Sequence, residues 1–179
     1  MPRRVLIWLV ILLLGPPFLR AQEFRVGAGV FLLAERGQDF QISLRPAASP
    51  WQVGFRHVQW RDHFNDPFTG RRLTETTETR SGPLVNYLFS PQSPGSWYLG
   101  GAVFRWSKRE ESLMTGEVSR AATTAPFIGG GYTRVLGRHG YFNLGLYLSP
   151  GAELSTKTSV SSEDDSGAFD IQIQLGARF

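Results

Sequence analysis

Apolar and polar residues alternate with a period of two along most of this chain, and the i, i+3, i+4 spacing of a helix is sustained nowhere. The final stretch, FDIQIQLGARF, shows the alternation most clearly, with an apolar face made of Phe169, Ile171, Ile173, Leu175, Ala177 and Phe179. Successive side chains of a β-strand point to opposite faces, so the pattern predicts an all-β protein. Soluble domains usually end in a polar tail, so we expect this last strand to be needed up to Phe179.

Eight segments carry the alternation, and they span residues 23–35, 38–45, 51–61, 80–89, 97–107, 123–135, 141–154 and 168–179. Short turns rich in Pro and Gly, at 46–50, 90–96 and 136–140, alternate with longer polar connections at 62–79, 108–122 and 155–167. The first connection, 36–37, is very short. This alternation predicts an up-and-down antiparallel arrangement with short turns at one end and long loops at the other.

The first 22 residues have the features of a cleavable signal peptide. The basic MPRR precedes ten apolar residues, Val5 to Leu14, and Ala21 offers a small residue for cleavage. Ten residues are too few to cross a bilayer as a helix, which takes roughly 20. We therefore expect a signal peptide at 1–22 and one domain at 23–179, with a retained N-terminal anchor as the alternative.

The net charge and the absence of cysteine argue against a nucleic-acid partner and against disulfide bonds. Loss of Arg3, Arg4 and Arg20 with the signal would lower the formal net charge from +4 to +1. Because no basic run remains, we expect no nucleic-acid partner. The sequence contains no cysteine, so the exported domain has no disulfides and depends on its backbone ladder and its packing.

Aromatic residues collect at strand ends, while charges collect in the longer connections. Beside the short turns, and at the end of the last strand, lie Trp51, Phe89, Trp97, Tyr98, Tyr141, Phe142 and Phe179. Trp60 and Trp106 represent a sparser group at the opposite strand ends. Aromatic girdles at both water interfaces, an even strand number and polar loops at one end are typical of a transmembrane β-barrel, in which closure leaves no unpaired edge in lipid.

On these features, residues 23–179 resemble the small eight-stranded outer-membrane barrels of the OmpA and OmpX type. The most specific element is FDIQIQLGARF, which is similar to the C-terminal signal strand read by the barrel assembly machinery. The resemblance implies a monomer in the outer membrane with both termini in the periplasm. Its partners would be outer-membrane lipid, lipopolysaccharide and the assembly machinery, and its role would be structural or one of surface interaction through the polar loops.

An eight-stranded barrel is just wide enough for side chains to fill its interior. The polar strand faces supply candidate lumen residues, chiefly Arg25, Arg45, Arg56, Arg105, Glu153, Asp170, Gln172 and Arg178. Such charges can pair across the lumen as a solid polar core, so a wide solute pore is disfavoured.

The motifs that suggest chemistry have simpler explanations. The glycine runs GAGV and IGGGYT do not open a helix in a βαβ unit, as phosphate loops require. His63 lies between Asp62 and Asp66 in a predicted loop, where polarity alone explains it, and no hydrolase-like His-x-Ser is present. The acidic SSEDDS, 161–166, lacks the glycine and distal glutamate of a calcium loop. We therefore expect no enzyme activity, cofactor or metal.

Two other functions remain open from the sequence. One is a narrow channel or minor porin. The other is a secreted soluble barrel of lipocalin type, with its apolar face turned inward around a ligand. The alternation itself does not distinguish these cases, because it does not say which face is inside.

Overall fold

The structure is a computed structural model that describes residues 22–29, 37–47, 49–157 and 162–179, with side chains for 23–29, 37–47, 49–154 and 168–179. Its eight strands are β1 (Gln22–Gly29), β2 (Gln38–Pro46), β3 (Trp51–Asn65), β4 (Arg72–Leu88), β5 (Gly95–Ser112), β6 (Val118–Leu136), β7 (Gly140–Lys157) and β8 (Ser162–Arg178). The expected all-β fold with eight strands is confirmed. The predicted signal peptide lies outside the described residues, apart from Gln22.

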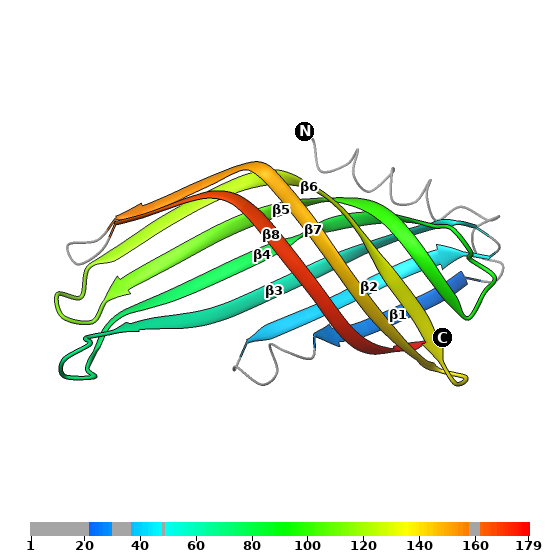
Figure 1. Ribbon diagram of the computed structural model, residues 1–179, viewed down its shortest axis with the longest axis horizontal. Coiled ribbons are helices and arrows are strands. Elements are labelled where there is room, and N and C mark those ends of the chain that lie inside the picture. Colours follow the sequence, from blue (N-terminus) through cyan, green and yellow to red (C-terminus); the bar gives the residue numbers. More distant parts are fainter. Residues whose placement is uncertain (1–21, 30–36, 48, 158–161) are drawn as a thin grey trace, which may run out of the picture.

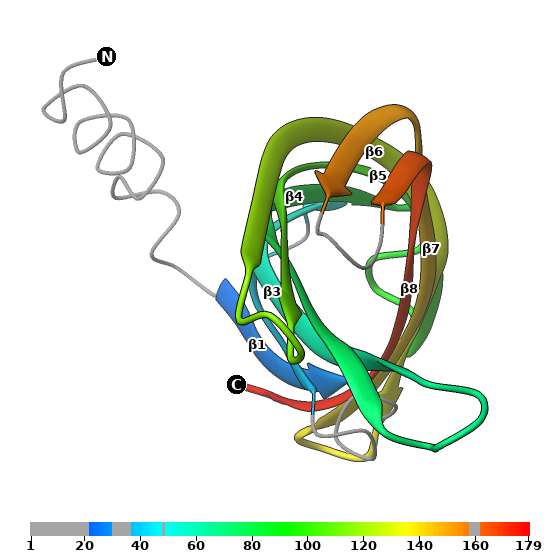
Figure 2. The same cartoon turned by 90° about the vertical axis from the view of Figure 1, so that its left-hand side faces the viewer.

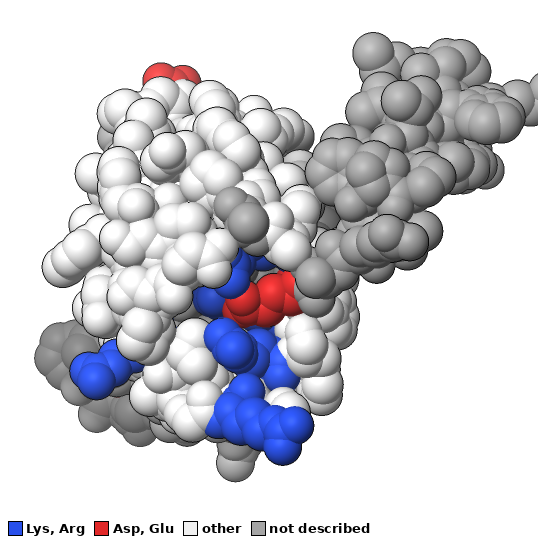
Figure 3. All heavy atoms as spheres, turned by 90° about the vertical axis from the view of Figure 1, so that its right-hand side faces the viewer, with Lys and Arg blue, Asp and Glu red and all other residues white. Residues whose placement is uncertain are grey.

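The strands form a closed antiparallel barrel in sequence order, and β8 returns to pair with β1. Figure 2 shows the ring from one end. The turns between β2 and β3, β4 and β5, and β6 and β7 share one end of the barrel, which we call the turn end and which lies on the right of Figure 1. The β3–β4 and β5–β6 hairpins lie at the opposite end, which we call the hairpin end, and β7 and β8 stay paired toward it as far as Lys157 and Ser162. Figure 3 looks onto the turn end, where basic side chains surround an acidic one.

The long polar connections predicted from the sequence are mostly strand. β3 and β4 stay paired as far as Asn65 and Arg72, and β5 and β6 as far as Glu111 and Val118. The prediction of long loops at 62–79 and 108–122 is therefore wrong. TETTET (74–79) carries polar residues on both faces, with Thr74 and Glu78 buried inside the barrel, and a search for an apolar face misses such a strand.

The described parts of β1 and β2 end at Gly29 and begin at Gln38, and β3 to β8 continue toward the hairpin end (Figure 1). The predicted strand segment 30–35 and residue 36 of the short first loop lie outside the described residues. Near the turn end the ring is closed by all eight strands.

The outer wall of the barrel is apolar, and a large part of its interior is polar. Exposed side chains around the wall include Val26, Ile42, Val53, Val85, Leu99, Ile128, Leu146, Phe169 and Ile171, while Arg25, Gln41, Gln52, Arg56, Asp170, Gln172 and Gln174 are buried. An apolar outer band is what lipid requires, and a soluble ligand-binding barrel has the opposite arrangement. Among the described residues, no helix is long and apolar enough to cross a membrane.

A bulge in β7 exchanges the inner and outer faces of that strand. Ser149 pairs with Ala168 and Glu153 with Ser166, so β7 spends extra residues against β8. The bulge contains Pro150, which has no N–H to donate to the ladder, and Gly151. Ser149 is buried, and beyond the bulge Ala152 and Leu154 are buried in turn. The assignment of Glu153 to the lumen is therefore wrong, because the side chain lies on the outer face.

Candidate functional site

An ion cluster bridges the middle of the lumen. The Arg56 guanidinium on β3 donates from Nε to Asp39 Oδ1 on β2 at 3.0 Å and from Nη2 to Asp39 Oδ2 at 2.8 Å. Its Nη1 donates to Asp170 on β8. The Arg56 side chain is only 1% exposed. Buried charges need such pairing, so this cluster ties three strands together across the interior.

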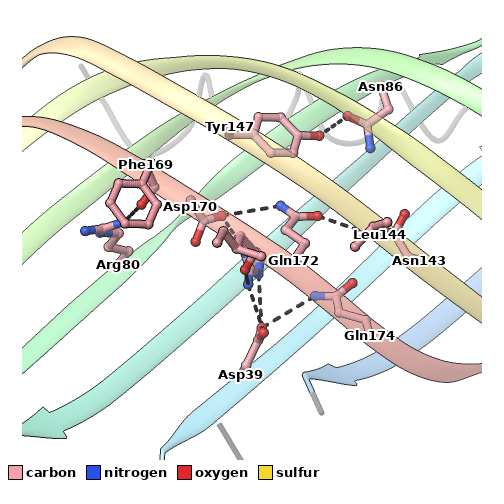
Figure 4. A network of polar contacts seen from close by, with 12 residues as sticks. Asp39, Arg80, Asn86, Asn143, Leu144, Tyr147, Phe169, Asp170, Gln172 and Gln174 are labelled. Carbon is pink, nitrogen blue, oxygen red and sulfur yellow. Dashed lines mark hydrogen bonds and ion pairs between the residues drawn. The ribbon is translucent and has the colours of Figure 1, made fainter. Parts of the chain in front are cut away.

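Amide side chains extend the ion cluster into a network, shown in Figure 4. Gln174 Nε2 donates to Asp39 at 3.4 Å, and Asn143 Nδ2 donates to Gln172 at 3.2 Å. Nearby, the Tyr147 hydroxyl donates to Asn86. The section of lumen between β2, β4, β7 and β8 is thus filled by mutually bonded polar side chains.

Two arginines also bond backbone carbonyls of β8. The described part of β1 pairs with β8 as far as Gly29, opposite Gln174, and Phe169 and Ile171 lie further along β8. Arg80 Nη1 donates to the Phe169 carbonyl, and Arg56 Nη2 donates to the Ile171 carbonyl at 3.2 Å. The two guanidinium groups thus tie the side chains of the lumen to the backbone of β8.

The lumen toward the hairpin end is filled by aromatic and aliphatic side chains. This buried cluster includes Leu84, Phe104, Trp106, Phe127, Tyr147 and Leu154. The Arg80 guanidinium lies 4.8 Å from the Trp60 ring centroid and 5.0 Å from that of Trp106, a cation–π arrangement. Trp106 is therefore an interior side chain, and the prediction that it belongs to an outer aromatic girdle is wrong.

Most predicted lumen residues lie inside, but Arg105 does not. Arg25, Arg56, Asp170 and Gln172 are buried, and the side chains of Arg45 and Arg178 are 12% and 33% exposed at the turn end. Arg105 lies on the outer face of β5. The error arises because β5 is apolar on both faces, with Val103 outside and Phe104 inside, so alternation alone leaves its orientation open.

The outer wall at the turn end carries part of the predicted aromatic girdle. Trp51, Phe89 and Trp97 are exposed there, and Phe142 is half-buried. The assignment of Tyr98 and Tyr141 to the same girdle is wrong. Each is adjacent in its strand to another girdle candidate, so the two neighbours must face opposite ways. Trp97 is 65% exposed, whereas Tyr98 is 4% exposed and packs inside.

Two girdle residues were missed from the sequence. The Tyr87 ring lies 5.0 Å from that of Trp51 and 5.7 Å from that of Phe89, and the Tyr132 ring lies 5.1 Å from that of Trp97. Tyr87 could have been found from the sequence, because it lies two residues before Phe89 and therefore on the same face.

At the closing seam between β1 and β8, the rings of Phe24 and Phe179 are 6.4 Å apart. The role of Phe169, Ile171, Ile173, Leu175 and Phe179 as an assembly signal stays a prediction.

The apolar outer band ends in a well-defined row of the sheet. Phe55 pairs with Pro83, and Val103 with Pro126, which makes the last apolar row. The next outward row toward the hairpin end joins His57, Ser81, Arg105 and Thr124. Arg105 therefore stands where the band gives way to polar surface, which explains how an arginine is accommodated on this face.

Four arginines form an outer basic patch beyond this boundary, and they are Arg61, Arg105, Arg109 and Arg120. They line a shallow depression of ≈ 500 Å³ together with Gln59, Thr77, Thr79 and Ser107. Arg109 and Arg120 are direct cross-strand partners, and like charges placed opposite each other destabilise a sheet. Arg109 also bonds Glu111 at 2.7 Å, on half-exposed side chains. The patch presents a concentration of positive charge next to the lipid-facing band.

The hairpin tips expose apolar side chains. Phe64, Phe68, Leu113 and Met114 are exposed there, and Phe68 is 95% exposed. The Leu113 N–H donates to the Leu73 carbonyl at 2.8 Å, so the end of β5 is held against β4. Exposed apolar groups outside the membrane band are typical of interaction surfaces.

The acidic residues around His63 are used by the hairpin backbone. Asp62 accepts from the His63 N–H at 2.7 Å, and Asp66 accepts from the Phe68 N–H at 2.8 Å and the Thr69 hydroxyl at 2.7 Å. These bonds lower the pKa of Asp66, the Thr69 hydroxyl having the larger effect. The carboxylates therefore act as turn-stabilising acceptors.

The other candidate motifs have structural roles or lie outside the described part. The run IGGGYT lies in β6, where a Cβ on Gly131 would approach the Leu144 carbonyl to 2.1 Å, so glycine permits close strand packing. Among the described residues, no group of three or more His, Cys, Asp or Glu side chains is placed to hold a metal. The side chains of 161–166 lie outside the described part.

The fold has counterparts among solved structures, although no protein-family model and no curated protein sequence matches this chain. Neisserial surface protein A is 14% identical over 88% of this chain and 91% of its own, with a TM-score of 0.51. Ail, the attachment invasion locus protein of Yersinia pestis, is 13% identical over 88% and 98%, with a TM-score of 0.52. A major outer membrane protein of Thermus thermophilus is 12% identical over the same shares, with a TM-score of 0.52. The chain therefore has the fold of the small eight-stranded outer-membrane barrels.

Proposed function

We propose that this protein is a non-enzymatic, monomeric outer-membrane barrel that acts in surface interaction, with its hairpin end outside the cell and its turn end and both termini in the periplasm. The observation that carries the proposal is the projection of β3 to β8 beyond the apolar band. After Val103, β5 continues for nine residues, or roughly 30 Å at about 3.3 Å per residue. This length raises the apolar tips well clear of the lipid.

The neighbouring structures agree with this placement. Two of them are named as a surface protein and an attachment protein, and the third as an outer membrane protein. The exposed Phe68, Leu113 and Met114 offer a contact surface that a purely structural barrel does not need.

Lipopolysaccharide is the partner we propose for the outer basic patch. Arg105, Arg109 and Arg120 lie beyond the last apolar row of the outer wall. Guanidinium groups bind phosphate through paired hydrogen bonds, which suits the phosphate groups of lipopolysaccharide. The directly opposed Arg109 and Arg120 would then share an anion between them.

The decisive measurement is binding of purified lipopolysaccharide to the folded protein in phosphatidylcholine nanodiscs. We expect the double variant Arg105→Gln, Arg109→Gln to bind at least tenfold more weakly than the wild type. Arg134→Gln, an exposed arginine of the same barrel near the turn end, is the matched control and should bind normally. Equal loss in the control, or no loss in the double variant, would contradict the assignment.

The channel alternative is disfavoured by the ion cluster that Arg56, Asp39 and Asp170 form across the lumen, together with the buried Trp106 and Phe104. In planar bilayers we expect the wild type to show no stepwise conductance. Reproducible single-channel steps that disappear with heat-denatured protein would favour the narrow channel over the surface role.

A further inference from the structure

A cavity of ≈ 310 Å³ opens at the turn end, away from the surfaces discussed above. We call it the turn-end pocket, and its polar lining consists chiefly of Glu23, Arg25, Arg45, Ser96, Thr133 and Arg178. It lies inside the ring, between β1, β2, β6 and β8 and the β4–β5 turn. Figure 3 views this face, with basic side chains around an acidic one. At about 30 Å³ for each water, the pocket has room for roughly ten water molecules.

The charges of this lining do not balance. Three arginines converge on one carboxylate, with Arg25 Nε at 2.5 Å and Arg178 Nη1 at 3.9 Å from Glu23 Oε1. Arg45 bonds the other oxygen of the same carboxylate. The remaining lining residues are uncharged, so the described pocket carries a formal charge of +2.

Hydrogen-bond donors in the pocket are left over after this pairing. Arg25 has partners besides Glu23, because its Nη1 donates to Thr133 at 2.8 Å and its guanidinium lies 5.2 Å from the Tyr141 ring centroid. By contrast, Arg45 Nε is buried and has no partner among the described residues. The Arg178 side chain is one-third exposed, and its contact with Glu23 is the longest of the three. Buried donors without partners are costly, so an acceptor is expected here.

The excess charge and the donor geometry point to one class of ligand. A phosphate monoester or inorganic phosphate carries about −1.5 to −2 at neutral pH and offers several strong acceptor oxygens. Guanidinium groups match such oxygens in paired hydrogen bonds. Because the lining faces the lumen and the lipid contacts the opposite wall, the pocket is accessible to an anion in solution. We propose that the turn-end pocket binds a soluble phosphate-bearing anion.

The proposal is tested by isothermal titration calorimetry at low salt, in which inorganic phosphate is added to the folded wild type in detergent. We expect saturable binding, and binding of acetate at least tenfold weaker because acetate carries a single charge. Arg178→Gln should weaken phosphate binding about tenfold, since this rim side chain leaves the buried Arg25 contacts intact. Arg138→Gln, in the β6–β7 turn at the same end but outside the lining, is the matched control and should not change the affinity.

Glu23→Gln gives a result that a purely structural role does not predict. Removing the competing carboxylate raises the pocket charge and frees donors of Arg25 and Arg45, so phosphate should bind several-fold more tightly. The shift in gel migration on heating verifies that each variant is folded. No saturable binding by the wild type, or equal weakening by Arg138→Gln and Arg178→Gln, would overturn the proposal.

A final comparison identifies the source of the phosphate. The affinity for inorganic phosphate should be the same in nanodiscs of phosphatidylcholine and of phosphatidylglycerol. A several-fold weaker affinity in phosphatidylglycerol alone would mean that lipid headgroups compete for the pocket, which would overturn a soluble ligand.

Discussion

At the scale of single residues, Arg56 carries the largest share of the interior pairing. It neutralises Asp39 and Asp170 and also bonds the Ile171 carbonyl. Removing one member of a buried ion network leaves the others uncompensated, which is far more costly than losing an exposed pair. The stability of the barrel should therefore depend on this guanidinium more than on any arginine of the outer wall.

We expect Arg56→Met to lower the free energy of unfolding by about 3 to 5 kcal/mol, because it strands two buried carboxylates. Urea unfolding in phosphatidylcholine vesicles measures the change. Arg134→Met, on the outer wall, serves as the control and should cost about 0.5 kcal/mol or less. Similar costs for the two variants would show that the lumen is hydrated enough to solvate Asp39 and Asp170.

Asp66 gives a pH-dependent prediction for the β3–β4 turn. Its folded pKa lies below the ordinary value of 3.8 because the Thr69 hydroxyl and the Phe68 N–H bond the ionised carboxylate. The turn stabilisation is thus fully present above the ordinary pKa and is lost as the pH falls through the lowered one. The amide resonance of Phe68 should titrate with a midpoint below 3.8. Asp66→Asn should abolish this titration, and a midpoint at or above the ordinary value would contradict the bonding described.

At the scale of elements, the closing strand β8 combines three kinds of contact. It pairs with β1 near the turn end, it is bonded by Arg56 and Arg80 further along, and it carries the ring of Phe179 against that of Phe24. Closure of the ring depends on the first of these, because only strand pairing removes an edge within lipid.

We expect Phe179→Asp to reduce assembly into the outer membrane several-fold while leaving export intact, because the change places a charge at the β1–β8 seam. The amount of heat-modifiable protein in the outer-membrane fraction is the measurement. Phe89→Asp, which removes another exposed girdle ring away from the seam, is the comparison and should have the smaller effect. Equal effects would mean that Phe179 contributes only as an interfacial aromatic.

At the scale of the whole molecule, the polarity of the outer wall indicates which part of the barrel lies in the membrane. The wall is apolar up to the row of Phe55, Pro83, Val103 and Pro126 and polar beyond it, while the interior is polar or closely packed. The barrel thus presents a band to lipid and a tall, hydrated wall beyond the band.

This placement predicts a depth dependence for an inserted charge. Leu146→Arg, within the apolar band of β7, should cost roughly 2 to 4 kcal/mol in vesicles, because an arginine near the bilayer midplane is poorly solvated. Ala122→Arg, also on the outer wall but beyond the polar row, should cost about 0 to 1 kcal/mol, because it stays in or near water. Refolding titrations of both variants in vesicles measure the difference. Equal costs would place the membrane elsewhere on the wall.

The sequence by itself was sufficient for the number of strands, their up-and-down order and the short turns. These features follow from local chemistry, namely the period of two and the turn residues Pro and Gly. It also pointed to the lumen positions of Arg25, Arg56, Asp170 and Gln172, because each of these lies opposite a clearly apolar face.

Tertiary structure decided which face of each strand is inside the barrel. It also decided the position of side chains whose environment depends on distant strands. Arg105 and Trp106 are adjacent in a strand that is apolar on both faces, so only packing against β4 and β6 places one outside and the other in the lumen. Glu153 lies beyond a bulge whose effect on the inward and outward faces is visible only in the burial of Ala152 and Leu154. The β3–β4 and β5–β6 extensions show that backbone pairing continues where the outer face is no longer apolar. Alternation records the two faces of a strand, but closure of the barrel decides which of them meets lipid.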